Sequence, residues 1–268
     1  GYDKYVVEGR ERLYDRVPPK IRQLTGAVGA AMPEGMRGRR FFRHFGLDGS
    51  RRYLDASTLF AADEMPNLFR GAAFAEMKAY DPWAPSLSYL RQGGDWISGL
   101  QYRDLNTYFP LDILTKVDRM TMAHSIEARP PLLDHHLVEF AATVPAHLRL
   151  RAGTTKYLLK RAMRGLLPHD IIDRPKQGFA VPLARWFRGR LAGFAREVLL
   201  SDTTRQRRYL NTEYLERLLS QHEHGRNLDL QLWTTMSFEL WCRKFLDTSR
   251  HRHDGPTRIV EHASARPA

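Results

Sequence analysis

The stretch Thr107–His135, TYFPLDILTKVDRMTMAHSIEARPPLLDH, is apolar enough to be buried, yet charged residues interrupt it repeatedly. These charged residues include Lys116, Asp118, Arg119, Glu127, Arg129 and Asp134. Buried charges are unfavourable unless they are paired or used on a ligand. We therefore expect the functional residues to be concentrated here, although no glycine-rich phosphate-binding loop accompanies the segment anywhere in the chain.

The pattern predicts a helix from about Leu111 to Glu127, ended by two consecutive prolines. Because successive helical residues turn by about 100°, Glu127 should lie roughly 20° from Lys116, with Arg119 about 60° to the other side. Such a charged stripe is either an ordinary ion-pair stripe facing solvent or the wall of a cleft that presents cations to a phosphate and a carboxylate to a reacting group. Periodicity alone leaves both interpretations open.

The rest of the chain is also predicted to be mainly helical. Helices are expected over residues 1–24 (interrupted at two prolines), 39–45, 55–60, 67–80, 134–145, 155–164, 185–200, 212–222 and 228–246. Residues 26–38, 81–87 and 174–182 contain clustered proline or glycine and are expected to be connections. No alternating strand pattern and no internal repeat is found.

Composition narrows the class of protein. Among 268 residues the single cysteine, Cys242, excludes an internal disulfide and a cysteine-based metal cluster and favours a reducing, cytoplasmic compartment. No apolar run approaches the roughly 20 residues needed to span a bilayer. The net charge of +12 permits a solvated arginine-rich surface, a nucleic-acid surface or steering of anionic small molecules. The basic residues are scattered in short pieces, which favours the first of these.

Two further basic positions are candidates for anion binding. Lys156 follows a turn at Gly153 and a predicted cap at Thr154, so it should fall in the first turn of a helix, beside free backbone N–H groups. Lys176 lies in a loop, RPKQGF, where Gly178 permits a tight turn near a ligand. For each lysine the alternative is an ordinary solvated side chain.

Three blocks of sequence together resemble a known family. They are LDILTKVDRMTMAHSIEARPPLLDHHLVEFAATVP (111–145), TTKYLLKRAMRGLLP (154–168) and DRPKQGFAVPLARWFRG (173–189). In order and spacing they resemble the C-terminal synthetase domain of glutamine-hydrolysing asparagine synthetases, and the opening Gly1-Tyr2 resembles the end of the family motif GDExFxGY.

This resemblance implies a mainly α fold. We expect residues 1–250 to form the helical C-terminal portion of an α/β ATP-pyrophosphatase (adenine nucleotide alpha-hydrolase-like) synthetase domain, without its parallel sheet. The polar residues 251–268 are expected to be a disordered tail. We also expect the chain to be a fragment of a longer protein.

The resemblance also implies a reaction. In this family ATP adenylates the side-chain carboxylate of aspartate and releases pyrophosphate, and ammonia from an N-terminal glutaminase domain then displaces AMP. ATP with Mg²⁺ would be bound mainly by the N-terminal part of the domain. By resemblance, Lys156 contacts the phosphates, Arg119 lies near the nucleotide, and Glu127 is a cleft carboxylate. In related β-lactam synthetases the residue equivalent to Glu127 pairs with the tyrosine equivalent to Tyr2. Lys116 and Lys176 are further candidates for binding ATP or substrate.

The chain also departs from the family pattern. It contains neither the SGGxDS pyrophosphate loop nor the N-terminal cysteine of a glutaminase, so we expect the chain alone to be inactive. One alternative is a sibling ATP-dependent amide ligase acting on another carboxylate, as in β-lactam synthesis or surface-polymer modification. Another is a non-catalytic basic helical module that binds nucleic acid or serves as a scaffold. We expect no nucleic-acid or membrane partner and leave a homodimer open.

Overall fold

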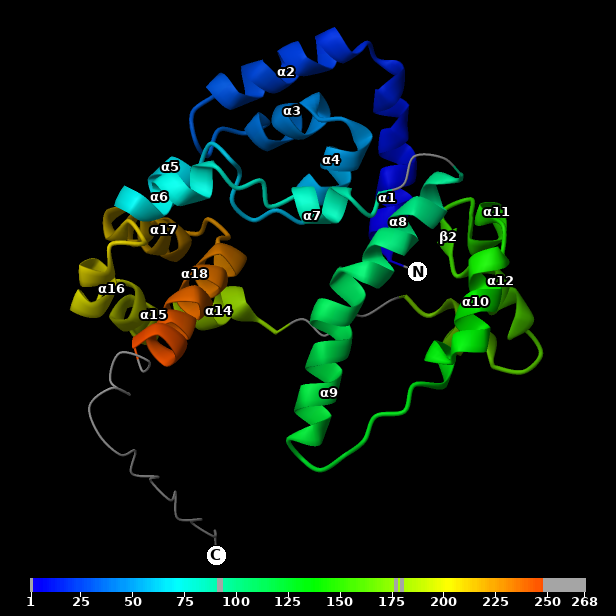
Figure 1. Ribbon diagram of the computed structural model, residues 1–268. Helices are drawn as coiled ribbons and strands as arrows, with labels where there is room; N and C mark the ends of the chain where they lie inside the picture. Colours follow the sequence, from blue (N-terminus) through cyan, green and yellow to red (C-terminus); the bar gives the residue numbers. More distant parts are fainter. Residues whose placement is uncertain (1, 91–93, 176–177, 179–180, 248–268) are drawn as a thin grey trace, which may run out of the picture. The chain divides into compact units, whose positions relative to one another are not determined.

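The computed structural model describes residues 2–90, 94–175, 178 and 181–247, and it confirms a mainly α fold (Figure 1). The chain divides into two compact units, one formed by residues 1–58 and 81–178 and the other by residues 59–80 and 179–268. Of the helices described, none is long and apolar enough to cross a membrane. The tail expected at 251–268 lies outside the described residues.

The first unit contains most of the predicted functional segment. Its elements are α1 (Asp3–Glu11), η1 (Arg12–Arg16), α2 (Pro19–Ala31), α3 (Arg39–Gly46), α4 (Gly49–Asp55), α7 (Ala84–Leu87), α8 (Trp96–Asn106), η2 (Phe109–Leu114), α9 (Thr115–Met122), η3 (Pro131–Leu133), α10 (His135–Thr143), α11 (Ala146–Arg149), β1 (Leu150–Arg151), β2 (Thr154–Thr155), α12 (Tyr157–Ala162) and α13 (His169–Asp173). Strands β1 and β2 form a small antiparallel hairpin.

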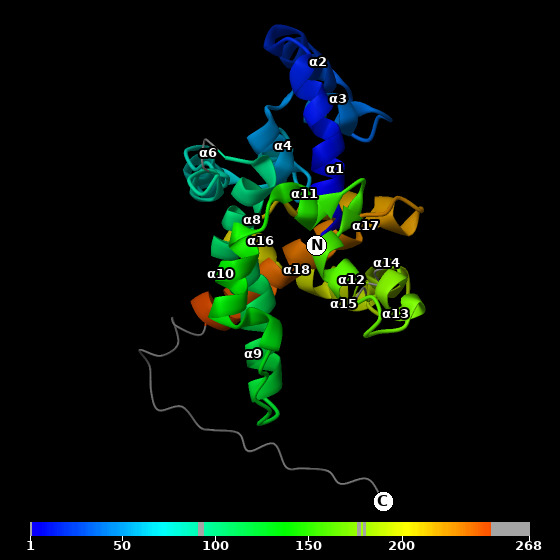
Figure 2. The same ribbon diagram turned by 90° about the vertical axis from the view of Figure 1, so that its right-hand side faces the viewer.

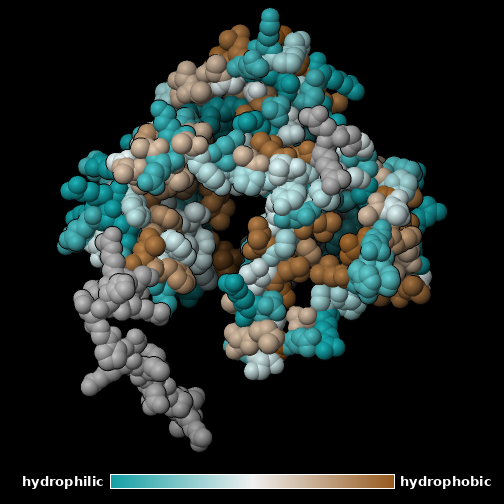
Figure 3. Space-filling model, in the orientation of Figure 1, coloured by the Kyte–Doolittle hydropathy of each residue, from teal (hydrophilic) through white to brown (hydrophobic). Residues whose placement is uncertain are grey.

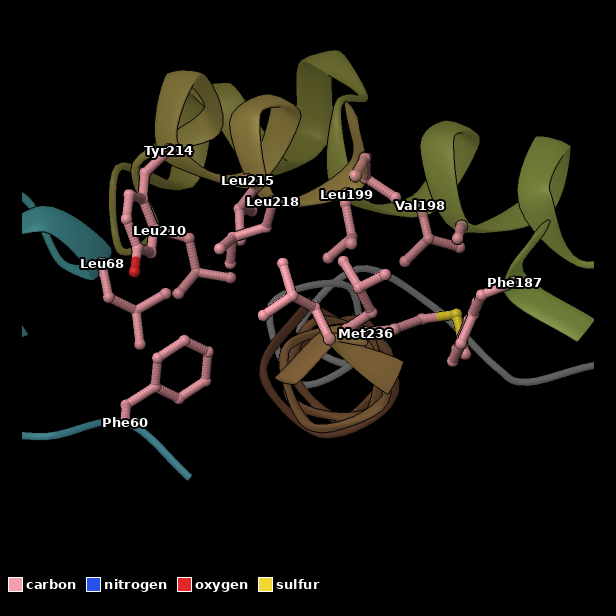
Figure 4. Packing of buried hydrophobic residues seen from close by; sticks show 14 of the residues in the cluster. Phe60, Leu68, Phe187, Val198, Leu199, Leu210, Tyr214, Leu215, Leu218 and Met236 are labelled. Atoms are coloured by element: carbon pink, nitrogen blue, oxygen red, sulfur yellow. The ribbon is translucent and has the colours of Figure 1, made fainter. Parts of the chain in front are cut away.

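The second unit is also helical, and α17 and α18 are its longest helices, with 12 and 14 residues. Its elements are α5 (Met65–Leu68), α6 (Gly71–Lys78), α14 (Leu183–Arg188), α15 (Ala192–Leu199), α16 (Asp202–Arg207), α17 (Thr212–Glu223), α18 (Asp229–Cys242) and η4 (Arg243–Asp247). Side chains from α15, α17 and α18 meet in a core that also takes in Phe60 and Leu68 (Figure 4). Leu215 and Leu232 are completely buried there.

The helix predicted from Leu111 to Glu127 is wrong in two respects. Its first part, η2, is a π-helix, and α9 then ends at Met122. Ser125 adopts a positive φ of 58°, and the N–H of Ile126 bonds back to the carbonyl of Thr121 at 3.0 Å, which closes the helix. An extended segment leads from the tip of α9 towards α10 (Figures 1 and 2). Glu127 is therefore not on the helix, and the predicted stripe is not formed.

Other boundaries follow from local capping. Asp134 accepts hydrogen bonds from the N–H groups of His136 and Leu137, so the predicted start of α10 is confirmed. Helix α8 was not predicted from the sequence, and Asp95 caps it by accepting from the N–H of Ser98 at 2.9 Å. The helix expected at 55–60 is wrong because Asp48 starts α4 earlier.

Three further sequence interpretations are corrected. The connection expected from residue 26 is helical as far as Ala31. The helices expected at 67–80 and 185–200 are each broken into two, into α5 and α6 and into α14 and α15. The predicted loop at 81–87 contains the short helix α7.

Glycines allow α2 and α3 to pack closely, side by side (Figure 1). A Cβ added at Gly46 would lie 2.5 Å from the Cα of Gly26, and one added at Gly29 would lie 2.7 Å from the backbone nitrogen of Arg43. Backbone cannot yield as a flexible side chain can. These glycines therefore serve helix packing, whereas Gly26 and Gly29 were expected to belong to a connection.

A buried arginine joins α1, η1 and α4. The Arg52 side chain is completely buried, and its guanidinium lies 3.2 Å from Asp15, 3.8 Å from Glu8 and 3.9 Å from Glu11. Burial raises the pKa of Glu8 to about 7, although the charge of Arg52 opposes this shift. Glu8 thus remains partly protonated at neutral pH.

The packing of α2 on α3 can be tested with Gly46→Ala. The added methyl group would overlap α2, so we expect a loss of about 1–3 kcal/mol in the free energy of unfolding, measured by urea denaturation. Gly193→Ala in α15 is the matched control, because a Cβ at Gly193 meets nothing within 4 Å. We expect this control to gain about 0.5–1 kcal/mol. Equal stability of both variants would contradict the close packing.

The pKa of Glu8 has a consequence for stability. Between its ordinary pKa of 4.5 and its folded-state pKa of about 7, the folded chain holds a proton that the unfolded chain releases. Glu8 therefore contributes stability below this window, and that contribution is lost as the pH rises through it. We expect Glu8→Gln to flatten the decline in unfolding free energy between pH 4.5 and 7, and Glu197→Gln, at an exposed site, to preserve it. An unchanged profile for Glu8→Gln would rule this out.

Candidate functional site

The charged residues singled out on α9 are exposed. Lys116 pairs with Asp112 one turn earlier, at 3.1 Å, and both side chains are about half exposed. The side chain of Arg119 forms no hydrogen bond or ion pair with the described residues. On α9, the charge of Lys116 is therefore paired with a carboxylate, whereas the charge of Arg119 is exposed to solvent without a partner among the described residues.

Glu127 lies in the segment after α9 and is exposed. Its carboxylate accepts two parallel hydrogen bonds from Arg129, at 2.9 and 3.0 Å. An exposed pair of this kind contributes at most about 1 kcal/mol, so a ligand could displace either member. Within the part of the chain that the structure describes, no hydrogen bond or ion pair joins Lys116, Arg119, Glu127 and Lys156 to one another.

Lys156 occupies the position between β2 and α12. Its φ of 55° and ψ of 33° place it in the left-handed region, which a residue with a side chain rarely adopts. Thr154, the predicted cap, instead pairs with Arg151 in the hairpin, so the helix begins at Tyr157. The Lys156 side chain is exposed and has no ion-pair partner among the described residues. Lys176, the remaining predicted cation, lies outside the described residues.

Tyr2 belongs to a cluster of aromatic rings at the start of α1. Its ring packs edge-on against Tyr5 and Tyr108, with centroid distances of 6.1 and 5.8 Å. The Lys4 ammonium lies 5.3 Å from the Tyr2 ring centroid and 4.9 Å from that of Tyr53, distances typical of cation–π contacts. Burial raises the pKa of the Tyr2 phenol, and the neighbouring Tyr108 and Asp104 raise it further. Tyr2 is therefore a neutral hydrogen-bond donor at neutral pH.

The centre of this cluster is Asp104, which sequence reasoning missed. It is 4% exposed. One carboxylate oxygen accepts from the Tyr5 hydroxyl at 2.6 Å and the Tyr53 hydroxyl at 2.9 Å, and it lies 2.9 Å from the Lys4 ammonium. The other accepts from Arg103 at 2.8 Å. Asp104 thus joins α8 to α1 and α4.

The protonation states in the cluster follow from these contacts. Burial alone would raise the pKa of Asp104, but the hydrogen bonds from Tyr5 and Lys4 hold it below its ordinary value. Burial is the main cause that raises the pKa values of Tyr5 and Tyr53, and the negative charge of Asp104 adds to it. At neutral pH, one carboxylate therefore faces two phenols and two cations.

One signal in the sequence could have found Asp104. Ile97, Leu100 and Asp104 are spaced by three and four residues and share the buried face of α8, so the carboxylate lies in an apolar stripe. The tyrosines could not be assigned to it, because Tyr5 and Tyr53 are 99 and 51 residues away along the chain.

Apolar side chains also reach the surface near the candidate residues. Figure 3 shows hydrophobic surface over the first unit, and the exposed residues of its α9–α10 region include Met120, Met122, Ile126, Leu132 and Phe140. Each of these residues is more than half exposed.

In the described residues, no group of three or more His, Cys, Asp or Glu side chains is placed to hold a metal ion.

The role of Asp104 can be tested with Asp104→Asn. The substitution removes the negative charge but leaves Lys4 and Arg103 beside it, so we expect a loss of about 3 kcal/mol or more in the free energy of unfolding. The control, Asp112→Asn, breaks only the exposed pair with Lys116 and should cost less than about 1 kcal/mol. Thermal or urea unfolding measures the stability of both variants. If Asp104→Asn lost less unfolding free energy than the control, Asp104 would not be the residue that holds the cluster together.

Comparison with known proteins places the chain in a family. The family model for asparagine synthase matches residues 1–243. Asparagine synthetase (glutamine-hydrolyzing) 1 of Bacillus subtilis is 29% identical over 248 residues, which make up 90% of this chain and 38% of that protein. A putative asparagine synthetase (glutamine-hydrolyzing) of Mycobacterium bovis is 32% identical over 252 residues, or 93% of this chain and 38% of the relative.

The chain thus spans 38% of the length of these two relatives. Asparagine synthetase (glutamine-hydrolyzing) of Gallus gallus is 38% identical over a shorter stretch of 92 residues, which covers 32% of this chain and 16% of the relative. No solved structure matches the chain. Because the family model extends over residues 1–243, nearly the whole of its length, the chain belongs to the asparagine synthase family.

Proposed function

We propose that this chain is the C-terminal part of the synthetase domain of a glutamine-dependent asparagine synthetase. In the proposed reaction, ATP adenylates the side-chain carboxylate of aspartate, pyrophosphate leaves, and ammonia displaces AMP to give asparagine. The observation that carries the proposal is the match of the asparagine synthase family model over residues 1–243. The chemistry requires cations where negative charge develops, on the α-phosphate under attack and on the departing pyrophosphate.

Lys156 is the residue that we propose to contact the phosphates. Its ammonium is exposed and has no carboxylate partner among the described residues, so its charge is free for an anion. We propose that Arg119, which is equally unpaired, lies near the nucleotide, and that Lys116 and Lys176 bind ATP or substrate. Lys116 would first have to leave Asp112, which takes little free energy at an exposed pair.

Glu127 and Tyr2 are the residues that we propose to act near the reacting groups. Glu127 would exchange Arg129 for a ligand group, since their pair is exposed. The Tyr2 phenol, whose pKa is raised, would keep its proton and donate a hydrogen bond. The ring of Tyr2 packs against the ring of Tyr5, and the hydroxyl of Tyr5 donates a hydrogen bond to Asp104, so this cluster holds Tyr2 in position.

The remaining parts of the reaction are proposed to lie outside these 268 residues. The SGGxDS loop, which grips pyrophosphate in this family, is not in the sequence. Mg²⁺ would arrive with ATP and be held mainly by that other part of the domain, and ammonia would come from an N-terminal glutaminase domain. We therefore propose that the chain alone neither adenylates aspartate nor hydrolyses glutamine. We also propose that the parent protein is cytoplasmic and that it binds no nucleic acid.

The proposal is tested with Lys156→Ala in the full-length protein. Loss of a charge contact to the transition state should lower the rate of asparagine formation by about 10²–10³-fold, with glutaminase activity largely intact. Pyrophosphate release and glutamate production measure the two activities separately.

Lys160→Ala is the matched control for this experiment. Lys160 lies on α12, four residues after Lys156, but pairs with Asp173 at 3.7 Å, so we expect near-normal synthesis. Near-normal synthesis in Lys156→Ala would contradict the assigned role. If the wild-type protein forms AMP and an amide only from a carboxylate other than that of aspartate, it is a sibling amide ligase.

A further inference from the structure

The hairpin β1–β2 holds Arg151 in a fixed place in front of α12. Its two strands pair Leu150 with Thr155 and Arg151 with Thr154. The two residues of the turn, Ala152 and Gly153, have positive φ angles of 47° and 78°. Such a two-residue turn matches the twist of a hairpin and leaves little freedom at its ends. The backbone of Arg151 is thereby placed close to the first turn of α12.

Two guanidinium groups converge on one phenol oxygen at this point. Arg151 donates a hydrogen bond to the Tyr157 hydroxyl at 3.0 Å, and Arg161 donates one at 3.2 Å. Arg161 lies one helical turn after Tyr157, while Arg151 comes from the hairpin and packs with its Cζ atom 5.1 Å from the Tyr157 ring centroid. Two separate elements therefore bring like charges together.

No carboxylate of the described residues balances the charge of these two arginines. Neither Arg151 nor Arg161 forms an ion pair with a carboxylate in the described part of the chain. Their neighbours differ, because Lys160 and Arg164 both pair with Asp173, at 3.7 and 3.4 Å. Arg151 and Arg161 therefore resemble Lys156, the residue before Tyr157, in lacking a carboxylate partner among the described residues, whereas Lys160 and Arg164 share one.

The phenol reports the positive potential at this place. Tyr157 has a pKa below its ordinary value, first because of the hydrogen bond from Arg161 and also because of the charge of Arg151. The oxygen already accepts two hydrogen bonds, so its own O–H is left to donate. Each guanidinium carries five N–H donors, most of them unused here. The cluster therefore offers only donors and positive charge.

We propose that Arg151, Tyr157 and Arg161 form a binding site for the phosphate group of a small molecule. A phosphate supplies the missing charge and accepts hydrogen bonds from both guanidiniums, a geometry that arginine favours. A nucleic acid would need a long track of free cations, whereas the nearby Lys160 and Arg164 share the carboxylate of Asp173. The site lies outside the residues assigned to the synthetase reaction, and its test needs no turnover.

The test is a titration of the chain, labelled with ¹³C in its tyrosine rings and followed by NMR. The probes are inorganic phosphate, pyrophosphate and AMP, and Tyr157→Phe identifies the resonance of Tyr157. We expect a saturable shift of this resonance with at least one probe. Whether inorganic phosphate or AMP binds more tightly shows if a free phosphate or a nucleotide is preferred, and either result supports the site.

Variants distinguish the site from diffuse charge. Arg151→Gln and Arg161→Gln should each weaken binding by about tenfold, the scale of one charge-assisted contact. The matched control is Arg164→Gln, which removes the same charge from the end of α12 and should weaken binding less than about twofold. Arg161→Lys, a milder change, keeps the charge but loses the planar fork, and it should fall between them.

Three results would overturn the proposal. The first is the absence of any saturable shift with all three probes. The second is an equal effect of Arg164→Gln and Arg161→Gln, which would show diffuse attraction. The third is binding of a short DNA duplex to which all of these cations contribute alike. Circular dichroism of each variant shows that a loss of binding is not a loss of fold.

Discussion

The first unit depends on one buried carboxylate. Asp104 receives the hydroxyls of Tyr5 and Tyr53 and lies against the cations of Lys4 and Arg103, so that α1, α4 and α8 meet at one point. A buried charge is tolerated only when it is paired and hydrogen-bonded, and here both oxygens are satisfied. The position of Tyr2 follows, because its ring rests on Tyr5 and beside Lys4.

The cations of the first unit fall into two groups, those paired with a carboxylate and those with no carboxylate partner among the described residues. Lys116, Lys160 and Arg164 each face a carboxylate, whereas Arg119, Lys156 and the Arg151–Arg161 pair meet none in the described residues. Surface pairs contribute little to stability, so the free cations are the more informative group. They agree with the proposed reaction, in which ATP carries the phosphates. The net charge of +12 could not locate these cations, and their scatter along the sequence favoured an ordinary solvated surface.

The sequence predicted the fold class and the family, but not the arrangement of the candidate residues. The cap at Asp134 was predicted because a side chain and two nearby N–H groups decide it. The end of α9 was missed because it depends on the positive φ of Ser125, which no residue type signalled. The stripe joining Glu127 to Lys116 assumed an uninterrupted helix, but α9 ends at Met122 and the turn at Ser125 separates the two residues. The contacts of Asp104 span up to 99 residues, beyond any local pattern.

We propose above all that this chain is part of an amide-forming ligase that works through an acyl-adenylate. The most direct measurement is isotope exchange between labelled pyrophosphate and ATP in the full-length protein, without ammonia or glutamine. We expect label to enter ATP only when aspartate is present, because adenylation is reversible until the amine arrives. Two results would contradict this proposal: exchange at the same rate with and without aspartate, or no exchange in a protein that still forms asparagine.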